Sequence, residues 1–484
     1  MWFGSRITDF VSLHRPSLLF SSSIRFKIKG KASTSSLSFS KPKDSLLYED
    51  CSEFLPWLQQ KAGVEISSFL SVGTSTYGRS LFASRFIQAG DCILKVPYSV
   101  QIAPDNIHPD IGFFLSDDVA NVARLALVVL AEQKMGQDSE WAHYINSLPR
   151  IGELHSTIFW SEDELEMVRQ SAIYQETLAH KAFIEKEFFK VIPVLEQFPQ
   201  KFEDTTLESF MHAYALVGSR AWGTSKGLSL IPFADFLNHD GVSETVLLSD
   251  EGKQISEAIA DRDYDSGDQV FISYGKFSNT TLLLDFGFTL PCNIHDQVEI
   301  WMCVPQHDPL HTMKVELLHQ HFMPTIKEFD SSQNSFIIRE VRSARGKGRG
   351  IPQSLRAFAR VLSATSLQEL KDLATEAAQS DGRLARCPLK DRNKEIEAHR
   401  LLLSEITLMI QEYDTSIKSL EYMNSHTTNS RFALRRQMAR DLLTGELRVL
   451  VDTWIITLLY KRFVGFYIKG KARVKKNGRW EGQV

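Results

Sequence analysis

The sequence predicts an α+β protein in which a β domain is interrupted by a helical block and followed by a helical C-terminal half. Residues 66–102 and 219–290 contain short apolar runs broken by glycine and proline, which is typical of brief strands joined by tight turns. From about 122 to 195, and again beyond about 300, apolar residues recur at helical spacing. With 484 residues, the chain exceeds the roughly 250–300 residues of a single core, so we expect two or three domains.

The composition is that of a folded protein with a sizeable core. Hydrophobic residues make up 43%, aromatic residues 11% and charged residues 24% of the chain, which excludes disorder throughout, collagen-like repeats and a membrane bundle. No apolar stretch approaches the roughly 18 residues that span a bilayer; the nearest, VLVDTWIITLLY, is short and contains Asp452. We therefore expect no transmembrane segment.

The first 43 residues differ in charge from the rest of the chain. They hold eight Lys or Arg, one acidic residue and eleven serines; subtracting this +7 from the total of −4 leaves residues 44–484 at −11. A basic, serine-rich, acid-poor N-terminus is typical of an organelle transit peptide, although a disordered basic tail has the same composition. The acidic remainder lacks the electrostatic basis for nucleic-acid binding, so we expect no nucleic-acid partner.

The expected elements follow one another in a clear order. A helix is expected within 45–64, strands in 66–102, and helices from 122 to 195, where Ser161 and Glu164 form a capping box. Strands return in LSLIPFADFLNHD, QISEAIADRDYDSGDQVFISYG and TLLLDFGFTL. Beyond about 300 the pattern is helical, with a second capping box at Ser366 and Glu369. The polar segment 330–352 reads as a loop.

Searches for common catalytic and ligand motifs find none. The sequence contains no phosphate-binding GxxxxGK[ST] loop, no strand–GxGxxG–helix fingerprint and no HExxH zinc site. The cysteines have no CxxC pair, so neither a disulfide framework nor a metal site is indicated, and we expect ordinary buried thiols. They are Cys51, Cys92, Cys292, Cys303 and Cys387.

Polar residues instead cluster within apolar β segments. Asn238 and His239 follow an apolar run, and buried polar groups need partners, so they belong either to a structural network or to a ligand site. The order of segments favours a ligand site. GRSLFAS, SRAW, IPFADFLNHD and GDQVFISYGKFSNTTLLLDFGF together resemble the SET-domain protein methyltransferases, specifically the plant Rubisco large-subunit lysine N-methyltransferase family. The resemblance covers roughly residues 50–450.

This resemblance implies a SET-type β-clip pseudoknot with an inserted helical region at about 110–210, followed by an all-α substrate-binding domain. The implied ranges are a SET domain at 46–292 and a helical domain at 297–451. Residues 452–484 depart from the family pattern and are basic, so we expect an unstructured or atypical extension there, with a tail that binds a membrane surface or an acidic partner as the alternative. The resemblance also implies transfer of a methyl group from S-adenosyl-L-methionine to a lysine of a protein. The sulfonium already activates the leaving group, so the reaction needs alignment and charge dispersal rather than a metal ion.

The family's functional residues transfer onto matching positions of this sequence. Tyr274 matches the catalytic tyrosine, whose hydroxyl orients the methyl group and the incoming amine, and Asn279 is expected to buttress the knot. The implied cofactor-binding residues are Tyr77, Gly78, Arg79, Arg220, Asn238 and His239. The implied substrate-binding residues are Asp235, Tyr274, Phe286 and Phe288.

Four departures from the family pattern lie mainly on the lysine side. Ser80 replaces a glycine of the first cofactor loop, and Thr224 replaces a second arginine. No tyrosine occurs between His239 and Tyr264, and Phe286 stands where tyrosine is common. Loss of channel hydroxyls makes room, which is expected to alter how many methyl groups are added.

Three functional hypotheses remain after these departures. The leading one is a lysine methyltransferase acting on an organelle protein, with the Rubisco large subunit or chloroplast aldolase as candidate substrates. The others are a weakly active or inactive protein-binding module and a methyltransferase that modifies a side chain other than lysine. The expected location is the chloroplast stroma, with the mitochondrion as the alternative.

Overall fold

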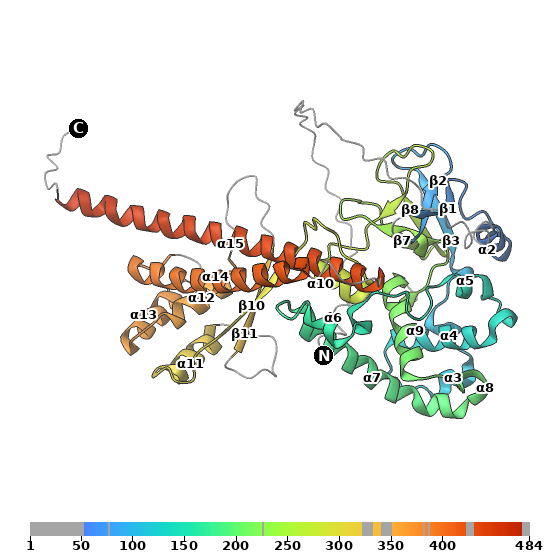
Figure 1. Ribbon diagram of the computed structural model, residues 1–484, viewed down its shortest axis with the longest axis horizontal. Coiled ribbons are helices and arrows are strands. Elements are labelled where there is room, and N and C mark those ends of the chain that lie inside the picture. Colours follow the sequence, from blue (N-terminus) through green and yellow to red (C-terminus); the bar gives the residue numbers. More distant parts are fainter. Residues whose placement is uncertain are drawn as a thin grey trace. The chain divides into compact units, whose positions relative to one another are not determined.

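The computed structural model of this protein describes most of the chain after the serine-rich N-terminus (Figure 1). The described residues are 53–75, 78–224, 227–321, 333–339, 351–380, 383–385, 388–422 and 430–476. The predicted transit peptide and Tyr77 lie outside them. The described chain divides into two compact units: unit 1 contains residues up to 153 and 182–274, and unit 2 contains 154–181 and residues from 275 onward.

Unit 1 combines several very small sheets with a helical layer. Its strands are β1 (Leu70–Ser75), β2 (Gly78–Ala83), β3 (Cys92–Pro97), β4 (Trp222–Thr224), β5 (Gly227–Ser229), β6 (Asn238–His239), β7 (Leu247–Asp250), β8 (Ile255–Ile259) and β9 (Phe271–Ile272). Its helices are α2 (Phe54–Ala62), α3 (Pro109–Phe114), α4 (Asn121–Met135), α5 (Ala142–Ser147), α8 (Pro199–Phe202) and α9 (Leu207–Arg220). Helix α7 (Ile173–Gln197) begins in unit 2 and ends in unit 1.

The strand pairings of unit 1 join segments that are far apart in the sequence. Strands β1 and β2 form an antiparallel hairpin, and β3, β8 and β7 form a three-stranded antiparallel sheet. The parallel pair β6 and β9 aligns Asn238 with Phe271 and His239 with Ile272. This pairing carries the chain from Ile272 to Tyr274 alongside His239, so two of the predicted site motifs meet.

The helical layer of unit 1 lies between the two β segments in the sequence. Helix α4 packs along α9, and its face is lined by buried residues from Val122 to Leu130. Thr206 opens α9 with its side chain accepting from the Ser209 amide, and Arg220 is the last residue of the same helix. Arg220 therefore lies where α9 ends, two residues before strand β4 begins.

Unit 2 is built mainly from helices. They are α6 (Glu162–Glu166), α10 (Asn279–Thr281), α11 (His311–His321), α12 (Gln353–Leu362), α13 (Leu367–Ala378), α14 (Arg392–Tyr422) and α15 (Ser430–Lys476). Helices α14 and α15 run side by side, and α12 packs on α14 (Figure 1). Ser161 and Glu164 form the predicted capping box of α6, and the Ser366 side chain caps α13.

Several local predictions were wrong. The C-terminal half also contains an antiparallel pair, β10 (Gln297–Cys303) with β11 (Gln333–Arg339), so part of the predicted loop 330–352 is a strand. Alternate burial of Phe336 and Ile338 is the period-two signal of that strand. Residues 452–476, where an unstructured or atypical extension was expected, continue helix α15 in backbone conformation, so this part of the extension is not unstructured.

The segment TLLLDFGFTL is helical rather than extended. The Ser278 side chain accepts from the Thr281 amide and opens α10, and a π-helical turn, η7, follows at Leu282–Phe286. Gly287 ends this turn with φ 78°, a left-handed conformation that favours glycine. A run of leucines suits a buried helical turn as well as a strand, so its apolar character alone did not separate the two.

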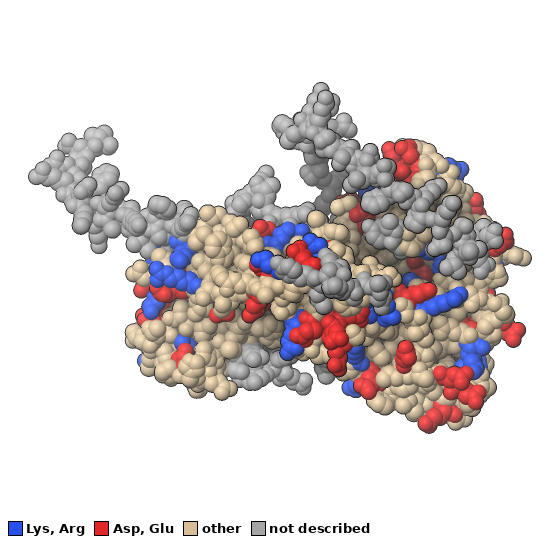
Figure 2. Space-filling model, viewed as in Figure 1, with Lys and Arg blue, Asp and Glu red and all other residues tan. Residues whose placement is uncertain are grey.

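The described cysteines are only partly buried. Cys92 is half-buried, while Cys292 and Cys303 are exposed, so the prediction of buried thiols was wrong for these two positions. Cys51 and Cys387 lie outside the described residues. Among the helices that the structure describes, none is long and apolar enough to cross a membrane. On the face shown in Figure 2, basic side chains are interspersed with acidic ones.

Candidate active site

Tyr274 belongs to a group of polar residues within unit 1 that also contains Asn238, His239 and Asp235. Its amide donates to His239 Nδ1 at 3.1 Å, and the two rings stack with their centroids 5.2 Å apart. Its hydroxyl donates to the Leu237 carbonyl oxygen at 2.8 Å. Burial raises the pKa of Tyr274 above its usual value, with the Arg220 guanidinium opposing the shift and Asp235 adding to it. The hydroxyl therefore stays protonated near neutral pH.

Asn238 is held against strand β2. Its side-chain amide donates to Ser80 Oγ at 2.8 Å and to the Arg79 carbonyl oxygen at 3.3 Å. Ser80 is fully buried and also pairs with Ser75 Oγ at 2.8 Å. Ser80, which replaces a glycine of the family pattern, thus provides an acceptor that positions Asn238. Gly78 begins β2 with φ 86°, and open space surrounds its α-carbon where a side chain would lie.

The hydrogen bond from the Asn238 side chain to the Arg79 carbonyl oxygen joins the first predicted cofactor loop to the segment that contains Asn238 and His239. The Arg79 guanidinium donates to the Ser147 carbonyl oxygen and lies over the Phe236 ring, 4.8 Å from its centroid. Its Nε is buried and has no hydrogen-bond partner among the residues that the structure describes. A buried donor without a partner is rare in folded proteins and is explained most simply by a ligand or bound water.

Asp235 also belongs to the group of polar residues around Tyr274. Its Oδ2 accepts from the Tyr144 hydroxyl at 2.9 Å. Its Oδ1 is buried and has no hydrogen-bond partner within the described part of the chain. Burial raises the pKa of Asp235 from 3.8 to about 6, although the Arg220 guanidinium, the Tyr144 hydroxyl and Arg79 all favour the ionised form. The carboxylate is therefore mostly ionised above about pH 6.

Two residues of this group were not identified from the sequence. Tyr144 is fully buried on α5 and reaches Asp235 across the chain. Trp222 begins β4 and meets the Tyr274 ring edge to face, with centroids 5.7 Å apart. Trp222 is the last residue of the SRAW segment, so its place in that segment was the available signal. For Tyr144 the only signal was its place in the segment EWAHYINSLPR.

The remaining predicted residues lie in unit 2. The Phe286 ring is 6.3 Å from that of Phe288 and 5.7 Å from that of Phe277. Their role in lining a lysine channel stays a prediction. The structure does not describe Tyr77, so its predicted cofactor contact also stays a prediction.

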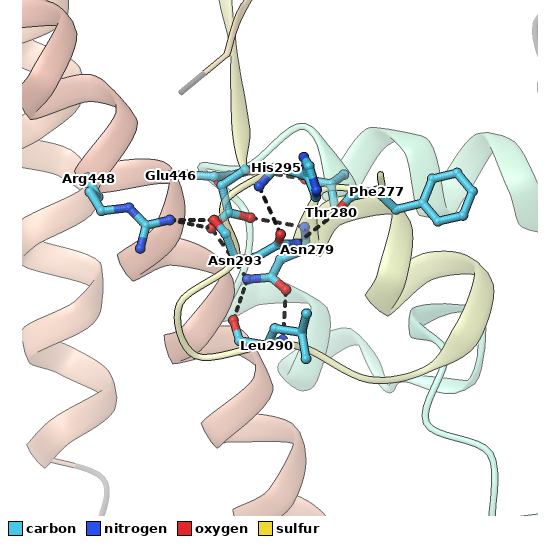
Figure 3. Close-up of polar contacts among 9 residues, drawn as sticks. Phe277, Asn279, Thr280, Leu290, Asn293, His295, Glu446 and Arg448 are labelled. Carbon is cyan, nitrogen blue, oxygen red and sulfur yellow. Dashed lines mark hydrogen bonds and ion pairs between the residues drawn. The ribbon is translucent and has the colours of Figure 1, made fainter. Parts of the chain in front are cut away.

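Asn279 belongs to a separate polar network within unit 2 (Figure 3). Its side chain donates to the Leu290 carbonyl oxygen at 2.9 Å and accepts from the Leu290 amide at 2.8 Å. Its amide donates to Asp296 Oδ1 at 3.0 Å, and Arg448 donates to Asp296 Oδ2 at 3.2 Å. Asn279 thus closes a loop and, through Asp296, connects it to Arg448 of helix α15. Its role in buttressing the knot stays a prediction.

Family models match two parts of the chain. The SET domain model matches residues 78–275, and the Rubisco LSMT substrate-binding model matches residues 305–450. The first range contains the whole group around Tyr274. The second contains most of the helices of unit 2.

Curated relatives are identical to the chain at about a quarter of the aligned positions. The ribulose-1,5 bisphosphate carboxylase/oxygenase large subunit N-methyltransferase of Pisum sativum is 27% identical over 302 residues, which are 58% of this chain and 60% of the relative. The [fructose-bisphosphate aldolase]-lysine N-methyltransferase of Arabidopsis thaliana is 28% identical, over 62% of this chain and 66% of the relative. The actin-histidine N-methyltransferase of Mus musculus is 27% identical, over 82% of this chain and 66% of the relative. The chain therefore spans less than two thirds of these relatives.

Solved structures share the fold. Rubisco LSMT bound to sinefungin and monomethyllysine superposes with a TM-score of 0.66 at 24% identity, covering 86% of this chain and 93% of that chain. Rubisco LSMT bound to AdoMet gives a TM-score of 0.65 at 23% identity with the same coverage. The predicted fold class, a SET fold followed by a helical region, is confirmed.

Proposed function

The chain carries a SET domain and a Rubisco LSMT substrate-binding domain, and we propose that it is an S-adenosylmethionine-dependent protein methyltransferase. The observation that carries this proposal is the parallel pairing of β6 with β9. This pairing stacks His239 on Tyr274 and leaves Asn238 fixed against Ser80. Residues from three separate sequence motifs thereby form one polar group within otherwise apolar β segments.

The residues present fit the cofactor. Arg79 Nε is a buried donor without a partner among the described residues, and Gly78 leaves space beside the backbone. Arg79, Arg220, Asn238 and His239 are the residues that would hold the cofactor, and Arg220 and Arg79 supply positive charge for its carboxylate. When bound, S-adenosylmethionine supplies a methyl group on a sulfonium whose leaving group is already activated.

The chain's own residues would align the reactants and limit water access. The protonated Tyr274 hydroxyl is directed by its bond to Leu237, and the Trp222 ring shields one edge of Tyr274. A low-dielectric site favours the neutral form of an incoming lysine amine, because burial penalises the ammonium ion. Proton loss to water before methyl transfer then suffices, and positioning accounts for most of the rate enhancement.

We infer a lysine side chain of a chloroplast protein as the substrate. The basic N-terminus of residues 1–43 and the two plant relatives support this location and substrate type. The Rubisco large subunit and fructose-bisphosphate aldolase are the first candidates, and the helices of unit 2 are the proposed docking surface. The mitochondrion remains the alternative location.

A second candidate function is methylation of histidine. The actin-histidine relative aligns with 82% of this chain, more than either plant relative does, and the departures at Thr224 and Phe286 fall on the proposed substrate side. Histidine reacts through a ring nitrogen that is already neutral near pH 7, so it would need less adjustment of charge than lysine. A module that binds protein without turnover is the third possibility.

The test is a labelling experiment with the full chain. The protein and its Tyr274→Phe variant are incubated with methyl-labelled S-adenosylmethionine and, in separate reactions, Rubisco holoenzyme, chloroplast aldolase, actin, and chloroplast and mitochondrial extracts. Label that depends on Tyr274 and maps to lysine by mass spectrometry supports the proposal; label on histidine selects the second function. Intact cofactor binding without label in any reaction would instead select the binding module.

A further inference from the structure

We propose that Tyr144 is a positioning residue for methyl transfer: its hydroxyl fixes Asp235 so that the free carboxylate oxygen faces an N–H group of the protein substrate. This inference rests on the proposed function. It begins from the Tyr144 hydroxyl, which donates to Asp235 Oδ2 at 2.9 Å across 91 residues of sequence. Tyr144 is not among the site residues that the sequence predicts.

The geometry leaves one acceptor of Asp235 unused. Tyr144 is fully buried and occupies Oδ2, whereas Oδ1 is buried and has no partner in the described residues. A buried carboxylate oxygen without a hydrogen bond is costly, roughly as much as the desolvation of the group itself. The cost is removed when a bound molecule donates to Oδ1, and such a partner must carry an N–H or O–H group.

The surroundings of Asp235 place this acceptor beside the proposed reaction centre. Arg220 at the end of α9 and Arg79 on β2 act on its charge, and its charge in turn acts on the Tyr274 hydroxyl. Tyr144 comes from α5, a third element. The two arginines hold Asp235 ionised, and Tyr144 holds its orientation. A substrate nitrogen bound at Oδ1 is therefore held close to Tyr274.

This arrangement predicts a pH dependence with a definite sign. The Tyr144 hydroxyl stabilises the ionised carboxylate, so its loss in Tyr144→Phe raises the pKa of Asp235 above about 6. A single hydrogen bond to a charged group corresponds to a shift of roughly one pH unit. The low-pH limb of kcat/KM should therefore move to higher pH in the variant.

The experiment uses the full chain and two readouts. Infrared difference spectra across pH follow the carbonyl band of protonated carboxyl groups, and Asp235→Asn identifies the Asp235 contribution. Tyr264→Phe is the matched control, because Tyr264 is also buried in unit 1 and its hydroxyl donates to Asp261 at 3.2 Å. Circular dichroism and thermal unfolding establish that each variant is folded.

The expected result is an upward shift of the Asp235 titration by about one pH unit in Tyr144→Phe. For the protein substrate identified by labelling, KM should rise roughly tenfold, with kcat within about twofold and the dissociation constant for S-adenosylmethionine unchanged. Tyr264→Phe should match the wild type in all of these. An unshifted titration, or a change in cofactor affinity with an unchanged KM, would overturn the proposal.

The same measurements separate this proposal from the proposed function. If the wild-type chain transfers no methyl group to any tested protein, the proposed function fails and the positioning role fails with it. If it transfers methyl groups and Tyr144→Phe behaves like Tyr264→Phe, only the role of Tyr144 fails.

Discussion

Two enclosed carboxyl groups, one in each unit, have contrasting surroundings. Asp235 in unit 1 accepts from the Tyr144 hydroxyl, and its Oδ1 has no side-chain partner among the described residues. Glu446 in unit 2 accepts from Ser171 at 2.9 Å, from Thr280 at 3.1 Å and from Tyr413 at 3.0 Å. One oxygen of Asp235 therefore lacks a side-chain hydrogen-bond partner in the described chain, whereas both oxygens of Glu446 accept hydrogen bonds.

Glu446 accepts more hydrogen bonds than Asp235, yet its pKa is the higher of the two. Burial raises the pKa of Glu446 to about 8 in spite of its three donors, and Asp296 adds to the shift. Asp235 rises only to about 6, because the Arg220 guanidinium favours its charged form. Neutral hydroxyl donors therefore offset burial less than a nearby cation does. An ionised carboxylate with an unused acceptor oxygen, such as Asp235, suits a ligand site. A neutral carboxyl group whose two oxygens both have hydrogen bonds, such as Glu446, suits a structural role between packed helices.

The largest expected effect comes from a pair of tyrosines, one beside each carboxyl group. Tyr274→Phe should lower the methyl-transfer rate about 10²–10³-fold, as the loss of one positioned hydrogen-bonding group does in other enzymes. Tyr413→Phe, which removes a donor from Glu446, should leave the rate unchanged and lower the free energy of unfolding by about 1 kcal/mol. Rates and denaturant titrations of both variants test this. Equal rates in the two variants would remove the functional distinction between the two regions.

Glu446→Ala should destabilise unit 2 by roughly 2–4 kcal/mol, because three buried hydroxyls lose their common acceptor. Glu446→Gln keeps one acceptor oxygen and should cost less. Urea unfolding at fixed pH gives both values. A loss below about 0.5 kcal/mol in Glu446→Ala would mean that the network contributes little to stability.

The pH dependence of stability should also come mainly from Glu446. Its folded pKa of about 8 lies above its ordinary value of 4.5, so the folded state binds the proton more tightly than the unfolded state does. The resulting stability is fully present below about pH 4.5 and is lost as the pH rises through about 8. Glu446→Gln should flatten this decline. Unfolding free energies measured from pH 5 to 9 provide the test, and an equal decline in the variant would contradict it.

Gly445→Ala should destabilise unit 2 by about 1–3 kcal/mol at a position next to Glu446 on α15. A β-carbon at Gly445 would lie 2.0 Å from Asp296 Oδ2, so α15 or the Asp296 side chain must shift. Gly218→Ala in α9 is the matched control, since no atom lies within 4 Å of the added carbon. Thermal unfolding of the pair should show a lower midpoint for Gly445→Ala alone.

The smallest expected effect concerns the product rather than the rate or stability. If Phe286 lines the lysine channel, Phe286→Tyr restores a hydroxyl and should change the proportions of mono-, di- and trimethylated product. Mass spectrometry of the methylated substrate measures these proportions. Unchanged proportions would remove Phe286 from the channel.

The sequence predicted the fold class and much of the site, because these depend on local patterns. The resemblance of SRAW, IPFADFLNHD and GDQVFISYG, in this order, to the methyltransferase family implied roles for Asn238, His239 and Tyr274, which the structure brings together. Apolar periodicity was less informative where a strand and a helical turn would bury the same residues. It placed 282–286 in a strand, whereas the Ser278 cap and Gly287 make this segment a helical turn.

What the sequence determined by itself was therefore the order of the β and helical segments and the residues of the motifs, while β10, β11 and the helical turn at 282–286 followed only from the structure. The tertiary structure decided which distant side chains meet: Tyr144 with Asp235, and Glu446 with Ser171 and Thr280. Periodicity and capping report on neighbours within a turn or a strand, whereas these hydrogen bonds join residues separated by 91 to 275 positions. The ionisation of both carboxyl groups depends on these pairings, so it too followed only from the folded chain.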